Sequence, residues 1–244
     1  SLERNDITSI EQGDFHGLTN LQSLYLRSND FTSIEPGDFE GLTNLQSLGL
    51  NDTGITSIES GDFVGLTNLQ SLDLSLNSLV SIESGDFTGL TNLQTLDLSR
   101  NSLASIEEGG FTGLTNLQTL SLFYNSITTI ERGDFQGLTN LRTLNLAGND
   151  IGSIEAGTFA ELANLETLTV TGSELTELNF AGANFTSLQP RSRHFEGPPS
   201  GIHIPGYQIT SLVLDDAILS ETAFNAIADA LVTSVFPAGI IDPV

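Results

Sequence analysis

The sequence contains no cysteine and no lysine. Without cysteine, the chain can form neither a disulfide framework nor a thiolate metal site. Without lysine, arginine supplies all 7 cationic side chains, which stand against 31 aspartates and glutamates and give a formal net charge of −24 at pH 7. A charge of this size keeps a protein soluble and opposes self-association, so we expect a monomer.

The shortage of positive charge also limits the classes of partner. Nucleic-acid binding relies on cations that displace the counterions of phosphate groups, and anionic membrane surfaces repel an acidic chain. No signal peptide and no long apolar run are visible. We therefore expect no nucleic-acid partner and no membrane insertion. The acidic surface indicates salty or calcium-bearing surroundings, with cation storage as the alternative.

Catalytic motifs are missing as well. The three histidines, His16, His194 and His203, do not stand at spacings that pair them with serine and aspartate. No phosphate-binding or dinucleotide-binding glycine fingerprint is present, because the glycines follow a repeat. We therefore expect no enzymatic activity, no cofactor and no metal site.

A block of 24 residues recurs along most of the chain without a slip in register. Its first complete copy begins at Leu21 and reads LQSLYLRSNDFTSIEPGDFEGLTN. One column of the repeat holds phenylalanine in every unit, at Phe15, Phe39, Phe63, Phe87, Phe111, Phe135 and Phe159. A strict period of this length predicts a solenoid, in which each unit buries its apolar side against its neighbours. We therefore expect one elongated domain over residues 1–244.

Each repeat contains a strand pattern followed by a polar turn. Leu24 and Leu26 alternate with Ser23, Tyr25 and Arg27, so the leucines face the core and the other three face solvent. All repeats have the same polarity, so consecutive strands run parallel. The next column holds asparagine in most units, at Asn29, Asn77, Asn101, Asn125 and Asn149, and predicts a buried ladder.

The return path of each repeat contains a glycine, an aspartate and a glutamate column. Gly37 marks a tight turn, and Asp38 is expected to cap the short helical turn that follows. The glutamate column, which includes Glu35 and Glu83, is filled in all seven units. Like charges on neighbouring coils repel by only about 1 kcal/mol in water. This column is either a solvated edge or a strip that binds cations.

The motif LxxLxLxxNxI, with phenylalanine near position 19, resembles the leucine-rich repeat family in its typical extracellular 24-residue form, from Ser1 to about Leu178. The resemblance implies an α/β solenoid: a right-handed horseshoe with a parallel sheet on the concave face and short helical or irregular turns on the convex face. It also implies recognition of proteins or other macromolecules on the concave face. The family often carries cysteine-rich caps in animals, and their absence favours a microbial, bacterial surface or secreted protein.

The repeat changes near the end of the chain. Residues 1–179 keep the regular period, residues 180–208 form an insertion rich in proline, and residues 209–244 contain the last strand and a capping helix. We expect the strand at Ile209, Leu212 and Leu214, and the helix from Ser220 onward. The insertion is either a functional loop or a neutral one. The chain begins within a repeat, so we expect it to be a fragment of a longer protein.

The candidate binding residues are exceptions to a small, polar surface. Leu76, Arg100 and Tyr124 share one column, and Phe123 precedes Tyr124, so together they have the composition of an interface hot spot. Arg100 is expected to lie over Tyr124 as a cation–π pair. Further candidates are Tyr25 and Arg27 near the N-terminal end and Arg191, Arg193 and His194 in the insertion. The alternative is ordinary scatter on a repeated surface.

Three functions remain open. The first is a recognition module at the cell surface or outside the cell that binds a protein or glycan on the concave face. The second is a structural or adhesive spacer of a cell surface. The third is a binder of divalent cations or ice, for which the acidic columns and the stacked Thr95, Thr119, Thr143 and Thr167 are the motive.

Overall fold

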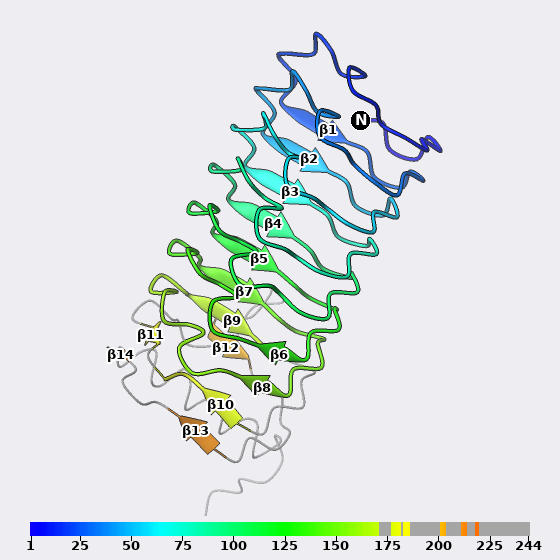
Figure 1. Cartoon of the computed structure of the whole chain (residues 1–244). Coiled ribbons are helices and arrows are strands. Elements are labelled where there is room, and N and C mark those ends of the chain that lie inside the picture. The colour runs from blue at the N-terminus through cyan, green and yellow to red at the C-terminus, as the bar shows by residue number, and fades with distance from the viewer. Residues whose placement is uncertain (171–176, 182, 186–200, 204–210, 214–217, 220–244) are drawn as a thin grey trace, which may run out of the picture.

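The structure is a computed structural model of the chain and describes residues 1–170, 177–181, 183–185, 201–203, 211–213 and 218–219. It is a solenoid with a parallel sheet along one face, as the repeat predicts (Figure 1). The sheet has eight strands in the order β1 (Ser23–Tyr25), β2 (Ser47–Gly49), β3 (Ser71–Asp73), β4 (Thr95–Asp97), β5 (Thr119–Ser121), β7 (Thr143–Asn145), β9 (Thr167–Thr169) and β12 (Gly201–His203).

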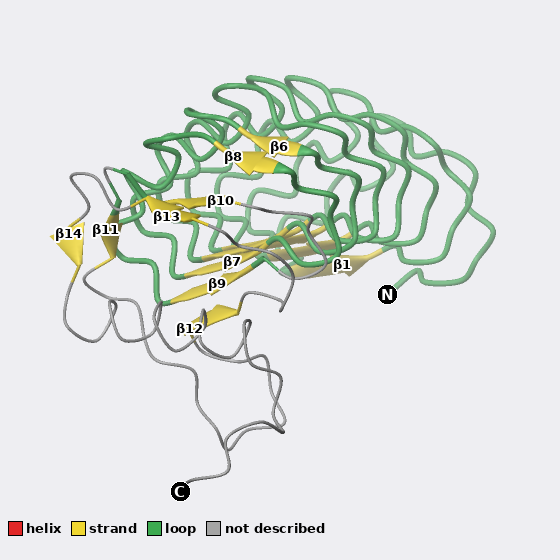
Figure 2. Ribbon diagram, turned by 90° about the horizontal axis from the view of Figure 1, so that it is seen from below, coloured by secondary structure: helices red, strands yellow, loops and turns green. Residues whose placement is uncertain are grey.

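Further parallel strands of two or three residues pair elsewhere on the coils. β6 (Thr129–Ile130) pairs with β8 (Ser153–Ile154), β10 (Glu177–Asn179) with β13 (Ser211–Val213), and β11 (Asn184–Phe185) with β14 (Ile218–Leu219). Figure 2 shows β6 and β8 on the side of the coils opposite β7 and β9. We call the solvent-facing surface of the eight-stranded sheet the sheet face, and the remainder of each coil the turn side.

The turn side of the described coils contains turns and no helix. Hydrogen bonds three residues apart hold these turns: the Leu42 amide donates to the Phe39 carbonyl at 3.2 Å, and the Leu45 amide donates to the Leu42 carbonyl at 3.0 Å. Glycine is needed at Gly37, whose φ of 102° is strained for other residues. The expected irregular turns are therefore confirmed.

A spine of phenylalanine rings forms the centre of the core. The rings of Phe15, Phe39, Phe63, Phe87 and Phe111 stack in sequence, with centroids 6.0 to 6.4 Å apart and planes within 12° of parallel. All of these rings are buried, and leucines and isoleucines from each coil surround them. Each coil therefore buries its apolar side only against the coils before and after it.

The asparagine column forms the expected ladder. Asn125 donates from Nδ2 to the carbonyls of Leu98 and Leu122, both at 3.0 Å, and its Oδ1 accepts from the Leu103 amide at 3.1 Å. Thr53 replaces asparagine in this column, and its hydroxyl donates to the Leu50 carbonyl at 3.0 Å. These bonds satisfy backbone groups that would otherwise be buried without partners.

The last coil differs from its sequence expectation. Ile202 pairs with Leu168 in the large sheet, and Leu212 pairs with Leu178 on the turn side. The two residues of each pair are 34 positions apart in the sequence. The final coil is therefore longer than the others by ten residues rather than about 20, and part of the expected 180–208 loop is the eighth strand. The segment around Leu212 is not the concave strand we expected, because its alternating pattern fits either strand position of a coil. The expected capping helix lies outside the described residues.

Candidate functional site

One column at the end of the sheet strands has a left-handed backbone although most of its residues are not glycine. Its φ values are 55° at Ser28, 58° at Asp52, 57° at Leu76, 56° at Arg100 and 52° at Tyr124. In the next coil the position is filled by Gly148, with φ of 70°. A left-handed residue with a side chain costs roughly 1–2 kcal/mol. We call these positions the left-handed column.

Hydrogen bonds between coils hold the left-handed column in place. The amides of Leu76, Arg100 and Tyr124 donate to carbonyls of the following coil at 2.9, 2.7 and 2.8 Å. The side chains of consecutive coils therefore lie one strand spacing apart, which is about 4.8 Å. The backbone thus presents them as a row along one edge of the sheet face.

Arg100, Phe123 and Tyr124 form a compact group that we call the aromatic–arginine cluster. The Arg100 Cζ lies 5.2 Å from the Tyr124 ring centroid and 5.8 Å from that of Phe123, and the two rings meet edge to face at 4.4 Å. These distances confirm the expected cation–π contact. Tyr124 is 55% exposed and Leu76 is 42% exposed. A role of these four residues in partner binding stays a prediction.

Two tyrosines lie against glycines of the next coil. A Cβ built on Gly148 would stand 3.2 Å from Cγ of Tyr124, and one built on Gly49 would stand 2.9 Å from Cδ1 of Tyr25. Each glycine therefore leaves the space that the ring occupies. The sequence carried a signal for this arrangement that residue-by-residue reasoning missed: at both places glycine follows tyrosine by one repeat.

Two half-buried aspartates, Asp73 and Asp97, lie next to this row. In the sequence, nothing distinguishes them from the other small polar residues of the repeat. Asp73 and Asp97 are register partners on β3 and β4. In each, Oδ1 accepts the amide hydrogen of the residue two positions on, Ser75 or Ser99, at 2.9 Å. Asn145 makes the same bond to the Ala147 amide at 3.1 Å two coils later. The bond fixes the orientation of both carboxylates.

Neither carboxylate forms an ion pair with a described residue. Among the residues that the structure describes, Arg142 with Glu166 is the only ion pair. The same described part holds no group of three or more potential ligands placed for a metal ion. The cation-binding alternative therefore gains no support from the acidic columns.

Tyr25 and Arg27, two further predicted site residues, lie apart from the cluster. Tyr25 and Arg27 are exposed, but they belong to the coil of β1, three strands away from Arg100 in the order of the sheet. Arg191, Arg193 and His194 lie outside the described residues. Among the predicted site residues that the structure describes, it therefore groups Arg100, Phe123 and Tyr124, with Leu76 on the neighbouring coil of the left-handed column.

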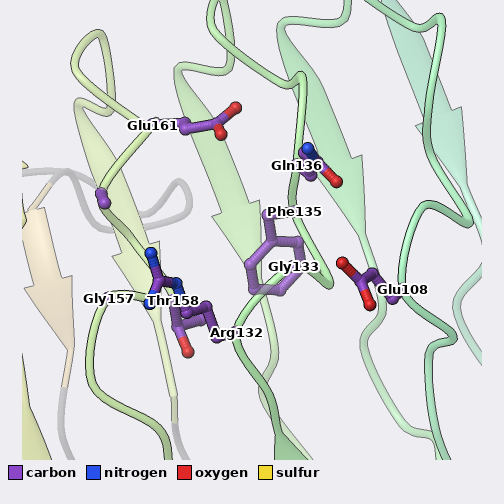
Figure 3. Close-up of a pocket in the computed structure, with 9 residues that line it drawn as sticks. Glu108, Arg132, Gly133, Phe135, Gln136, Gly157, Thr158 and Glu161 are labelled. Atoms are coloured by element: carbon purple, nitrogen blue, oxygen red, sulfur yellow. The ribbon is translucent and has the colours of Figure 1, made fainter.

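The turn side has a pocket lined by side chains of both charges (Figure 3). Glu108, Arg132, Gln136 and Glu161 line it, and Glu161 accepts the Gly137 amide hydrogen at 2.8 Å. Figure 3 shows Glu108, Gln136 and Glu161 apart from one another. The arrangement offers no chemistry beyond weak polar contacts.

Buried aspartates cap the turns of the turn side. Oδ2 of Asp62 accepts the Glu59 amide hydrogen at 2.7 Å, and Asp86 and Asp134 make the corresponding bond at 2.8 Å. Each aspartate therefore bonds the backbone amide three residues before it. The sequence suggested instead that it would cap the residues after it. Burial raises the pKa of all three carboxyls from 3.8 to about 6.

We expect the backbone at Leu76 to prefer glycine. Leu76→Gly should leave the free energy of unfolding within about 0.5 kcal/mol of the original or raise it, because relief of the left-handed strain offsets the entropy of glycine. Leu76→Val should lower it by about 1 kcal/mol, because a β-branched residue tolerates positive φ poorly. Urea denaturation of both variants measures the difference, and equal stability would contradict the assigned strain.

Comparison with known proteins identifies the repeat. The family described as leucine rich repeat matches residues 1–55, 43–103 and 91–151. A search of curated proteins finds no match to the sequence. Among solved structures, a crystal structure of a TLR13–ssRNA13 complex is similar with a TM-score of 0.74 and 24% identity over 91% of this chain. The chain spans 37% of the length of that protein.

That complex corrects one sequence-based expectation. Nucleic acid was excluded as a partner because of the net charge of −24, yet a protein of the same fold occurs in a complex with single-stranded RNA. The exclusion is wrong because net charge sums over every face of a solenoid, whereas contacts with bases depend on local aromatic and arginine side chains.

As to membranes, no helix in the described part of the chain is long and apolar enough to cross one.

Proposed function

Since this chain belongs to the leucine-rich repeat family, we propose that it is a non-enzymatic recognition module, extracellular or at a cell surface, that binds a macromolecule on its sheet face. The aromatic–arginine cluster, together with Leu76, is the proposed centre of the contact. The observation that carries this proposal is that large side chains occupy the left-handed column where glycine fits without strain.

The composition of the cluster supports a binding role. Aromatic and arginine side chains dominate the energetically important positions of interfaces, since they bury a large area with few rotatable bonds. Tyr124 and Leu76 are among the few large apolar side chains exposed on the described surface. The surrounding positions of the sheet face are mostly serine, threonine, asparagine and aspartate, which suit the polar rim of an interface.

Selection from mixed libraries tests the location of the site. The protein would be used to select binders from a library of random peptides and from a library of random single-stranded RNA. We expect Tyr124→Ala to weaken the selected binders by about 2 kcal/mol, which is roughly thirtyfold. Titration by fluorescence anisotropy measures the change.

Val64→Ala is the matched control, because Val64 is 59% exposed and belongs to the turn side. It should leave the affinity of the same binders unchanged. If Val64→Ala weakens them and Tyr124→Ala does not, the recognition surface is on the turn side and the proposal is wrong.

A further inference from the structure

Asp73 and Asp97 are neighbours on adjacent strands of the sheet face, and neither forms an ion pair with a described residue. Asp73 and Asp97 are register partners on adjacent parallel strands, so their Cα atoms are separated by about one strand spacing of 4.8 Å. The backbone bond to Oδ1 holds each carboxylate in place, and Oδ2 has no hydrogen-bond or ion-pair partner among the described residues. Two fixed like charges at this separation favour any cation that can contact both.

Leu76 and the aromatic–arginine cluster follow these carboxylates along the chain and on the next coil. Leu76 follows Asp73 by three residues, and Arg100 follows Asp97 by three, so each carboxylate and its neighbour in the left-handed column belong to the same coil. Arg100 lies over the rings of Phe123 and Tyr124 and pairs with no carboxylate in the described part of the chain. The acidic pair and the exposed side chains of Leu76 and Tyr124 therefore belong to adjacent coils on the same edge of the sheet face.

We propose that the partner is a basic peptide segment, in which an arginine or lysine side chain contacts Asp73 and Asp97 and an adjacent apolar residue packs on Leu76 and Tyr124. This inference rests on the proposed function of the sheet face and names the chemistry of its partner. Charge complementarity carries it: the fixed carboxylates attract a cation locally, and the net charge of −24 draws a basic partner from a distance.

Arginine fits the acidic pair better than lysine does. Its planar guanidinium donates several hydrogen bonds in a fixed fork and can contact two carboxylates at once, whereas a lysine ammonium acts as a single point of charge. A peptide with arginine should therefore bind more tightly than the same peptide with lysine. Binding should weaken as salt is added, because both aspartates are partly exposed.

Matched peptides and isosteric variants form the test. The probes are labelled, end-blocked peptides that repeat Gly-Arg-Leu-Ser, the same peptide with neutral citrulline for arginine, the same with glutamate, and a single-stranded oligouridylate. The variant is Asp73→Asn with Asp97→Asn, since Asn145 already makes the same backbone bond in that column and the fold should be kept. The control, Glu83→Gln with Glu107→Gln, removes the same charge from exposed positions of the turn side.

We expect the arginine peptide to bind the original protein and the turn-side control equally, and to bind the double aspartate variant roughly tenfold more weakly. The citrulline and glutamate peptides should bind more weakly than the arginine peptide to every form. Thermal melts of both double variants verify that each is folded.

Several results would overturn the inference. They are no binding of the arginine peptide, equal binding of the arginine and citrulline peptides, equal losses in the two double variants, or tighter binding of the oligouridylate than of the arginine peptide. None of these results contradicts the proposed function, which is tested separately with Tyr124→Ala and Val64→Ala. A sheet face that binds neutral or acidic ligands would keep the recognition role and remove the basic partner.

Discussion

Replacing Phe87 with alanine should lower the free energy of unfolding by about 3–5 kcal/mol. The ring is 1% exposed and stacks between Phe63 at 6.3 Å and Phe111 at 6.0 Å. Its removal would leave a cavity at two coil-to-coil contacts at once. In a solenoid each coil is stabilised only by its neighbours, so the array has no other core to compensate for the loss.

Glu83→Gln provides the comparison from the same coil. Glu83 is exposed, and its backbone amide rather than its side chain bonds to Asp86. Its neutralisation should change stability little, or raise it slightly at low salt by relieving repulsion along the glutamate column. Urea denaturation of the two variants gives both values. A larger loss for Glu83→Gln would mean that the columns of the repeat have been assigned to the wrong sides.

The regular coils could be predicted from sequence because every column has one physical role. Phenylalanine fills the core, leucine alternates along the strand, and asparagine satisfies buried backbone groups, and each role recurs at the same spacing. An error in one unit would have conflicted with the same column in its neighbours. The seven parallel strands of the regular coils, β1 to β5, β7 and β9, and the turns without helix in the described coils follow from this consistency.

The last coil escaped prediction for the opposite reason. The strand Gly201–His203 has little of the leucine pattern, and Ser211–Val213 fits the pattern better but pairs on the turn side. A coil that differs in length from the others has no column to fix its register. The leucine pattern therefore predicted the strand of the large sheet at Ser211–Val213 instead of at Gly201–His203.

The residues of the proposed binding surface could be predicted from the sequence, but their geometry could not. Leu76, Arg100, Phe123 and Tyr124 stood out because a repeated surface of small residues makes exceptions visible. The left-handed backbone beneath three of them, and the glycine that makes room for the Tyr124 ring, depend on atomic positions. The orientation of Asp73 and Asp97 likewise depends on hydrogen bonds that the sequence does not specify.

The protein should become less stable as the pH rises from about 4 to about 6. Burial raises the pKa of Asp62, Asp86 and Asp134 from 3.8 to about 6, so in this range the folded state holds protons that the unfolded state has released. Stability falls with pH wherever the folded state binds more protons, and it levels off above the folded pKa. The change amounts to at most about 3 kcal/mol for each carboxyl. Repulsion among the other acidic residues acts in the same direction.

Asparagine at all three positions tests the origin of this dependence. The amide keeps an oxygen for the backbone bond and cannot ionise, and at Asp62 it also replaces Oδ1, a buried oxygen without a hydrogen-bond partner among the described residues. The triple variant Asp62→Asn, Asp86→Asn, Asp134→Asn should be more stable than the original protein near neutral pH and should lose most of the slope between about pH 4 and 6. Urea denaturation across this range measures both effects. If the original protein instead gains stability on going from about pH 5 to about pH 8, these aspartates are ionised in the folded state at no cost, and the caps act as ordinary charged caps of the turns.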